Sequence, residues 1–209
     1  MNAAESGPTI AGLILAGGLN TRMGGVEKSR IPVGGSPLIH RIVILLQSLF
    51  PEVILVSNQP QLHRDLPGGV VLTSDRYRRR GPLGGIHAGL ARTGAEAVFC
   101  VACDMPSLSR DLILEQIREF RSAAAMGCQV LIPRIGALIE PLHGLYLTEL
   151  EPLAAEICSG PGGYSIRSLL ARARTCYWEL EEDPRLSRAF SNLNTPKDFH
   201  VHIEESGRA

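Results

Sequence analysis

The sequence predicts a Rossmann-like α/β domain with a mainly parallel β-sheet and helices on both faces. The 209 residues, 44% of them hydrophobic, are enough for one sizeable core. Short apolar runs alternate with segments of helical pattern, as expected for β-α-β units. No repeat, low-complexity segment or long linker interrupts this pattern. We therefore expect one domain over residues 1–209, frayed at 1–8 and 204–209.

Buried strands are expected where apolar residues run together and turn residues follow. In the first half these runs cover residues 10–15, 53–56, 70–72 and 97–101. In the second half, which is less regular, they cover residues 129–132, 141–147 and 176–180. Strands that alternate with helices pair mainly in parallel and are buried on both faces. The order of the runs thus predicts a sheet enclosed by helices.

Helical patterns lie between these strands. They cover residues 38–50, 84–92 and 111–121, and the end of a further helix at 169–174. Ser36 and Pro37 suit the N-cap and first turn of the first helix, and Ser109 suits the N-cap of the third. The string TPKD at 195–198 combines a cap, a first-turn proline and a capping-box carboxylate, so it predicts a last helix.

Composition excludes several classes of protein. Lys+Arg and Asp+Glu are both 21, which gives no overall field for nucleic acid or membranes. No run approaches the ~20 apolar residues of a membrane span, and the first residues do not have a signal-peptide pattern. Five scattered cysteines do not suggest a disulfide framework. Cys100 and Cys103 match C-x-x-C, but residues three apart in a strand face opposite sides, so we interpret the match as coincidence. We expect a cytoplasmic protein.

A glycine-rich turn, LAGGLNTRMGGVEK at 15–28, follows the first strand. Loops at the carboxyl ends of strands line the ligand crevice of an open α/β sheet. Glycines let the backbone approach phosphates, and Arg22 and Lys28 add positive charge. A Walker A loop would need glycine where Glu27 stands, and G-x-G-x-x-G is absent. The turn predicts a different phosphate site; the alternative is a surface turn with two solvated bases.

Two aspartates follow strands at the same predicted edge. Asp104 lies in ACDMP, directly after the strand at 97–101, and Asp75 lies just past the strand at 70–72. Mg²⁺ commonly takes one or two carboxylates together with phosphate oxygens and water, so we expect Asp104 to bind Mg²⁺. The alternative for both residues is a structural role in a turn.

Several ordered motifs together resemble one family. They are the glycine-rich turn, GPLGGIHAGL at 81–90, ACDMP at 102–106, EPLHGLY at 140–146 and NLNTPKD at 192–198. These motifs, distributed over most of the chain, resemble the molybdenum cofactor guanylyltransferases, the molybdopterin-guanine dinucleotide biosynthesis protein A family. The resemblance implies a nucleotidyltransferase fold and a magnesium-dependent transfer of GMP from GTP to molybdenum-loaded molybdopterin, with release of pyrophosphate.

The resemblance also implies the residues of the site. The nucleotide would contact Leu15, Ala16, Gly17, Gly18, Lys28, Asn58, Asp75 and Asp104. Arg22 would help to hold the triphosphate, Lys28 would stabilise charge on the leaving pyrophosphate, and Asp104 would hold Mg²⁺. The acceptor would lie over the second half, with Arg167, Asn192 and Asn194 as candidates. The chain departs from the family at Val56, where an asparagine is frequent, and at Glu27, where aspartate is usual.

Other interpretations stay open. The arginines between residues 76 and 80 surround Tyr77 and either attract an anionic acceptor or form a solvated loop. A cytidylyltransferase acting on molybdopterin, or on a sugar or polyol phosphate, would use the same loop and aspartate. A non-catalytic nucleotide-binding regulatory domain is the third possibility. Maturation proteins of molybdoenzymes are further partners to consider.

Overall fold

A computed structural model describes residues 7–17, 32–33, 35–162 and 164–190 of the chain. The strands are β1 (Ile10–Leu15), β4 (Val53–Val56), β5 (Val70–Thr73), β6 (Ala97–Ala102), β7 (Val130–Ile135), β8 (Leu138–Ile139), β9 (His143–Leu147) and β10 (Thr175–Leu180). A two-stranded hairpin consists of β2 (Pro32–Val33) and β3 (Ser36–Pro37). The helices are α1 (Leu38–Gln47), α2 (Gly81–Leu90), α3 (Arg110–Ala125), α4 (Glu151–Ser159), α5 (Ile166–Arg172) and α6 (Pro184–Ala189).

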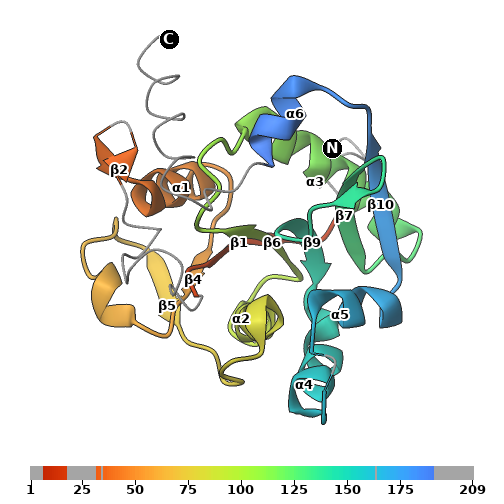
Figure 1. The fold of residues 1–209 in the computed structure, drawn as a ribbon, viewed down its shortest axis with the longest axis horizontal. Coiled ribbons are helices and arrows are strands. Elements are labelled where there is room, and N and C mark those ends of the chain that lie inside the picture. The colour runs from red at the N-terminus through yellow and green to blue at the C-terminus, as the bar shows by residue number, and fades with distance from the viewer. Residues whose placement is uncertain (1–6, 18–31, 34, 163, 191–209) are drawn as a thin grey trace.

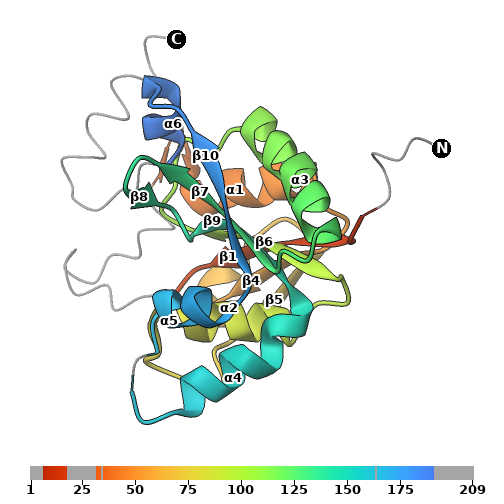
Figure 2. The same ribbon diagram turned by 90° about the vertical axis from the view of Figure 1, so that its right-hand side faces the viewer.

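The central sheet has the strand order β10-β7-β9-β6-β1-β4-β5, and β8 pairs with β7. Helices α1, α3 and α6 cover one face, and α2, α4 and α5 cover the other (Figures 1 and 2). This arrangement confirms the predicted α/β class and the two helical layers. It is the layered solution expected when a sheet is apolar on both sides.

The sheet consists of a parallel half and a mixed half. In the parallel half, β1 pairs with β4 and β6, and β4 pairs with β5, all in parallel. In the mixed half, β9 runs antiparallel to both β6 and β7, whereas β10 pairs in parallel with β7. Because β7 and β10 run in the same direction as β1, their carboxyl ends reach the same edge of the sheet. The amino end of β9 also lies at that edge.

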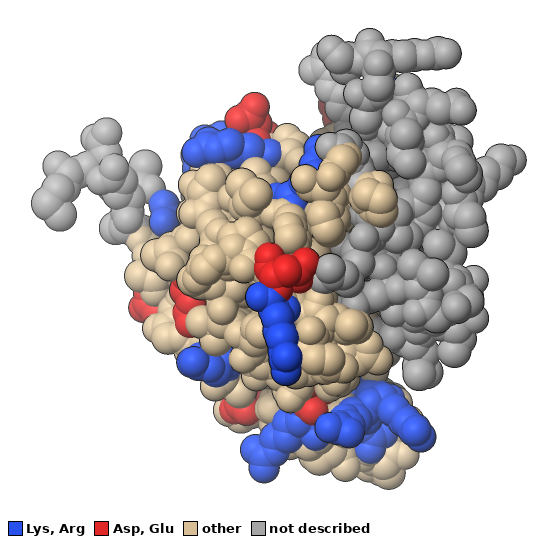
Figure 3. Space-filling view, turned by 90° about the vertical axis from the view of Figure 1, so that its left-hand side faces the viewer, with Lys and Arg blue, Asp and Glu red and all other residues tan. Residues whose placement is uncertain are grey.

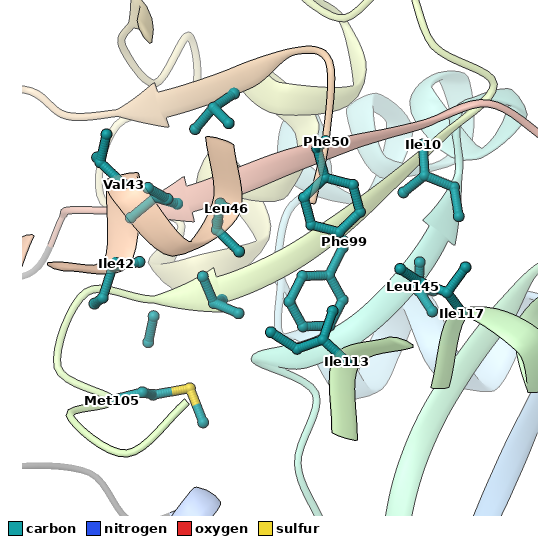
Figure 4. Close-up of a cluster of buried hydrophobic side chains, with 14 of the residues drawn as sticks. Ile10, Ile42, Val43, Leu46, Phe50, Phe99, Met105, Ile113, Ile117 and Leu145 are labelled. Atoms are coloured by element: carbon teal, nitrogen blue, oxygen red, sulfur yellow. The ribbon is translucent and has the colours of Figure 1, made fainter. Parts of the chain in front are cut away.

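Alternate residues of the strands face the two helical layers. On β1, Ile10 and Ile14 belong to the cluster beneath α1 and α3, whereas Leu13 belongs to the cluster against α2. Phe50 stacks on Phe99 in the first cluster, with ring centroids 5.7 Å apart (Figure 4). Each buried Leu, Ile or Phe side chain of this kind contributes about 1.5–3 kcal/mol to folding. The sheet is thereby fixed between two hydrophobic layers.

The structure corrects the predicted start of the first helix. Helix α1 begins at Leu38, after Pro37 in the N-cap position, and no side chain caps it. Ser36, predicted to be the cap, pairs instead with Val33 in the β2–β3 hairpin. Pro37 has the extended backbone angles φ −53° and ψ 136°, so the helix cannot include it. Ser109 does cap α3, because its hydroxyl accepts a hydrogen bond from the backbone N–H of Leu112.

Other boundaries differ because tertiary contacts decide them. Helix α2 begins three residues before the predicted position 84, with Pro82 in its first turn. Strand β9 begins at His143 rather than 141, since its N–H donates to the Glu140 carbonyl in a tight turn. The sequence patterns did not predict α4, β8 or α6. The predicted helix at 195–198 lies outside the described residues.

Two further expectations concern the strands and the cysteines. Cys100 belongs to the cluster against α2, whereas Cys103 packs against the cluster on the other face, so the two thiols do face opposite sides. None of the described cysteines forms a disulfide. No helix within the described ranges is both long and apolar enough to cross a membrane.

Candidate functional site

The carboxyl ends of the parallel strands meet at one edge of the sheet, and backbone hydrogen bonds continue beyond them. The N–H of Ala16 donates to the carbonyl of Val56, at 2.9 Å. The N–H of Cys103 donates to the carbonyl of Leu15, at 3.1 Å. These bonds hold the beginning of the glycine-rich turn between β4 and the loop that carries Asp104. The structure thus brings two of the predicted site segments together.

Asn58 and Asp75 form a reciprocal pair at the ends of β4 and β5. The Asn58 amide donates to the Asp75 carboxylate at 3.1 Å, and the Asp75 backbone N–H donates to the Asn58 side-chain oxygen at 3.3 Å. Partial burial raises the pKa of Asp75, and the Asn58 hydrogen bond and the charge of Arg78 oppose that rise. Asn58 therefore holds Asp75 in a defined orientation.

A small hollow lies against this pair. It is lined by Leu15, Gly17, Val56, Asp75, Gly81, Pro82 and Gly85. The carboxylate of Asp75 is the only ionisable group among these lining residues, so it sets the charge of the hollow. Three residues predicted to contact the nucleotide, Leu15, Gly17 and Asp75, are therefore in one place.

Glycines allow α2 to approach this hollow closely. A Cβ atom at Gly89 would lie 2.5 Å from the Leu13 side chain, and one at Gly84 would lie 2.9 Å from the carbonyl oxygen of Tyr77. Both distances are shorter than real contacts of a Cβ atom, so a larger residue would push the helix away. The glycine-rich string at 81–90 therefore brings the helix backbone close to both β1 and the loop after β5.

His87, on the same helix, connects this region to α4. It is 2% exposed, and its Nε2 lies 2.9 Å from a carboxylate oxygen of Glu151. The Tyr77 ring packs edge-on against the His87 ring, with centroids 4.8 Å apart. Glu151, His87 and Tyr77 thus join α4 to the loop between β5 and α2.

Asp104 lies half-buried after β6, the middle strand of the sheet path. The carboxylate of Glu140 is close enough for the Asp104 charge to act on it. Burial is the main cause that raises the pKa of Glu140, and the charge of Asp104 adds to it. The backbone N–H of Leu142 donates to the Glu140 carboxylate at 3.1 Å and fixes its direction. Two carboxylates therefore lie in the same part of the edge.

A buried histidine connects β9 to α3 close to these carboxylates. His143 is fully buried; its Nδ1 lies 2.8 Å from the Gln116 side-chain oxygen, and the Gln116 amide donates to the His143 carbonyl at 2.9 Å. Phe99 and Phe190 each pack edge-on against the ring, with centroids 5.0 Å away. Burial lowers the pKa of His143 to about 4. A neutral imidazole thus joins α3 to β9.

The arginine-rich loop is anchored on aromatic rings at two points. The guanidinium of Arg80 lies 3.9 Å from the centroid of Tyr164, in the connection between α4 and α5, and that of Arg76 lies 5.9 Å from Tyr77. Arg79 has a left-handed backbone, with φ 61°. Figure 3 shows basic side chains gathered at the end of the molecule where this loop lies. The loop thus contacts Tyr164, which lies three residues before Arg167, one of the residues predicted to contact the acceptor.

A much larger cavity, of about 1060 Å³, opens at the carboxyl ends of β7 and β10. It is lined by Pro133, Ile135, Ala137, Leu138, Ile139, Glu140, Glu182, Asp183 and Phe190. Its walls are mostly apolar, and its three ionisable residues are all acidic. Since Glu140 borders it, the cavity adjoins the Asp104 region.

Some predicted site residues fall in other parts of the chain. Gly18, Arg22, Lys28, Asn192 and Asn194 lie outside the described residues. Arg167 is described: it is exposed on α5, near the end of the connection that carries Tyr164.

The motif EPLHGLY contributes to the family resemblance, but the sequence pattern indicated no role for its Glu140 or His143. Functional groups were expected after strands, whereas Glu140 precedes a strand that runs the opposite way. The position of the acidic Glu140 directly before the predicted strand at 141–147 was the sequence feature that could have indicated its role.

The residues at this edge fit a hard divalent cation. The described residues contain no group of three or more His, Cys, Asp or Glu side chains that would enclose a metal ion by themselves. Mg²⁺ does not need such a cage, because it keeps waters and binds phosphate oxygens alongside one or two carboxylates. Asp104, with Glu140 nearby, supplies that number of oxygen donors.

Comparison with known proteins is consistent with this geometry. Residues 12–176 match the model of the family described as "MobA-like NTP transferase domain". The molybdenum cofactor guanylyltransferase of Syntrophotalea carbinolica is 37% identical over 190 residues, which cover 90% of this chain and 87% of that protein.

Two solved structures share the fold. The molybdopterin-guanine dinucleotide biosynthesis protein A of Archaeoglobus fulgidus superimposes with a TM-score of 0.78 at 22% identity, covering 96% of this chain and 100% of that one. The 4-diphosphocytidyl-2C-methyl-D-erythritol synthase of Anaerococcus prevotii superimposes with a TM-score of 0.71 at 14% identity, covering all of both chains. At these identities the likeness concerns the fold alone.

Proposed function

This chain belongs to the MobA-like NTP transferase family, and on that basis we propose that it transfers GMP from GTP to molybdenum-loaded molybdopterin and releases pyrophosphate. The observation that carries the proposal is the position of Asp104. Asp104 follows β6, the middle strand of the sheet, and lies between a small hollow bordered by Asp75 and a large cavity bordered by Glu140. A transferase that joins two substrates needs such a shared centre with a site on each side.

The reaction requires positioning and charge stabilisation. An oxygen of the acceptor phosphate attacks the α-phosphorus of GTP, a new P–O bond forms, and the bond to pyrophosphate breaks. Asp104 would hold Mg²⁺, which neutralises phosphate charge when bound. Arg22 and the glycine-rich turn orient the triphosphate, and Lys28 stabilises the leaving pyrophosphate. No general base is needed, because the attacking phosphate oxygen is already a nucleophile.

Recognition of the base would involve a subset of the predicted residues. The Ala16 N–H and the Leu15 carbonyl already form hydrogen bonds within the sheet. Gly17 and Asp75 both border the small hollow. We assign the base to these two residues, with Asn58 orienting Asp75. A carboxylate accepts well from the adjacent N1–H and amino group of guanine, and cytosine does not offer that pair of donors.

The decisive experiment is an assay of pyrophosphate release. Each nucleoside triphosphate is supplied with Mg²⁺, in the presence and absence of molybdenum-loaded molybdopterin. We expect release with GTP only when the acceptor is present, and discrimination against CTP on the order of a hundredfold. A preference for CTP would instead assign the chain to the cytidylyltransferases. Nucleotide binding without release would favour a regulatory domain.

The remaining expectations also belong to the proposal. We infer one domain over residues 1–209, a cytoplasmic location, and delivery of the product to molybdoenzyme maturation proteins. The last follows from the function, because a finished cofactor must reach the enzymes that use it.

A further inference from the structure

We propose that the large cavity binds the pterin ring of the acceptor through the carboxylate of Glu182, an inference that rests on the proposed function. The recognised chemistry is a 2-amino-4-oxopyrimidine edge, in which a ring N–H lies next to an exocyclic amine. A carboxylate can accept from both donors at once. The same edge occurs in guanine, so an experiment must distinguish the two rings.

The positions of the small hollow and the large cavity along the sheet edge favour this assignment. Asp104 follows β6, and three strand spacings separate β6 from β5 on one side and from β10 on the other. At 4.7–4.9 Å per spacing, each side extends about 14 Å from Asp104. Asp75 follows β5, and Glu182 follows β10. A carboxylate thus lies at each end of the edge, with the proposed centre of transfer between them.

The two ring systems of the product are arranged in the same way as these two carboxylates. The product carries guanine at one end and a pterin at the other, joined through the pyrophosphate linkage formed in the reaction. Molybdopterin connects its pterin to its phosphate through one further ring, so the pterin lies beyond the phosphate from the reacting centre. With guanine on Asp75 and the phosphates at Asp104, the pterin would extend towards Glu182.

The lining of the cavity suits a flat heterocycle. Its volume of about 1060 Å³ is ample for a fused ring system, and its walls include Leu138, Ile139 and Phe190. Leu138 is 77% exposed, so the cavity presents an apolar side chain on its open side. Phe190 is held in place by its edge-on contact with the buried His143.

Glu182 is the carboxylate best suited to accept from a ligand. Glu140 already accepts from the Leu142 backbone and lies next to Asp104. Asp183 has another interaction within the protein. Among the described residues, none donates a hydrogen bond to Glu182. The neighbouring Glu181 does not line the cavity and therefore provides a matched control.

The test uses two fluorescent probes and the full chain. Pterin carries the 2-amino group, whereas lumazine has an oxygen in its place and presents a different edge. Each probe is titrated by fluorescence against the wild type, Glu182→Gln and Glu181→Gln. We expect pterin to bind about tenfold or more tightly than lumazine. Glu182→Gln should weaken pterin binding about tenfold and remove most of that preference, whereas Glu181→Gln should change neither.

A guanosine arm distinguishes the two sources of the recognised edge. Guanosine binding should weaken in Asp75→Asn and remain unchanged in Glu182→Gln. Guanosine that displaces pterin and depends on Glu182 would overturn the pterin assignment. Equal binding of pterin and lumazine, equal effects of the two glutamate variants, or no pterin binding up to about 1 mM would do the same.

The outcome can be separated from that of the proposed function. If GTP and loaded molybdopterin release pyrophosphate but pterin binding does not depend on Glu182, only this inference fails. If pterin binding depends on Glu182 but no transfer occurs with any nucleotide, the cavity assignment stands and the transferase proposal fails.

Discussion

The two halves of the sheet place functional residues at the same edge in different ways. In the parallel half, Asn58, Asp75 and Asp104 each follow the strand that positions them. In the mixed half, Glu140 precedes β9, which runs antiparallel to β6. His143 at the start of β9 therefore lies opposite Val101 at the end of β6. A reversed strand thus brings the residues ahead of it to the edge where parallel strands present the residues behind them.

The halves also differ in what they contribute. The parallel half provides a small hollow, backbone bonds between strand ends, and a carboxylate oriented by an amide. The mixed half provides a large, mainly apolar cavity and a buried histidine that joins β9 to α3. We infer that the parallel half holds the nucleotide and the mixed half shapes the acceptor side. Variants in each half test that division.

Asp104 follows β6, the strand where the parallel half meets the mixed half, so its loss should have the largest effect. Asp104→Asn removes the carboxylate that we propose as a ligand of Mg²⁺ while keeping the size of the side chain. We expect turnover to fall on the order of a thousandfold, with an unchanged thermal unfolding midpoint. The assay is pyrophosphate release at saturating substrates. Asp111→Asn, in the exposed first turn of α3, is the matched control and should remain active. Normal turnover of Asp104→Asn at ordinary magnesium would remove this residue from the centre.

His143 should make the mixed half sensitive to acid. The unfolded chain takes up the proton near pH 6.5, whereas the folded chain does so only near pH 4, because burial disfavours the imidazolium. The contribution of His143 to the free energy of unfolding is fully present above pH 6.5 and is lost as pH falls towards 4. At pH 5 the free energy of unfolding is lower by about 2 kcal/mol.

Urea unfolding at pH 7 and pH 5 measures this loss. His143→Leu should be less stable at pH 7 but should lose less stability on acidification. His40→Gln, at a histidine whose side chain is 23% exposed, serves as the control. Equal acid sensitivity of the wild type and His143→Leu would show that other groups are responsible.

A variant of Asn58 tests the role of the parallel half in nucleotide binding. Asn58→Ala removes the amide that orients Asp75 and leaves that carboxylate without its side-chain partner. We expect KM for GTP to rise about tenfold, in line with the loss of about 1–2 kcal/mol, while KM for the acceptor stays the same. Steady-state kinetics with each substrate varied in turn measures both constants, and Gln59→Ala is the neighbouring control. A change confined to the acceptor would contradict the division between the halves.

The smallest effect should come from the arginine-rich loop. If Arg78 and Arg79 attract the anionic acceptor, Arg78→Ser and Arg79→Ser together should lower kcat/KM for the acceptor about three- to fivefold at low salt. The difference should disappear at high ionic strength, because exposed charges are screened there. Rates measured across a salt series give the answer. An unchanged salt dependence would indicate that these two side chains are simply solvated.

The class of fold and much of the parallel half could be predicted from the amino-acid sequence. Runs of apolar residues predict buried strands wherever they occur, because burial on both faces requires apolar side chains throughout. In such a sheet the residues after the strands must reach one edge, so the order of the strands alone assigns Gly17, Asp75 and Asp104 to that edge. The cap of α3 was equally local, since Ser109 bonds only three residues ahead.

Tertiary structure decided the rest. The direction of β9 depends on its pairing with strands distant in sequence, and no local pattern encodes it. That direction alone moves Glu140 from the far edge of the sheet to the neighbourhood of Asp104. The start of α1 was likewise set by a hairpin, and the pairing of Asn58 with Asp75 by the adjacency of β4 and β5. Local chemistry indicates which residues can bind and react, whereas the positions where they meet depend on long-range pairing.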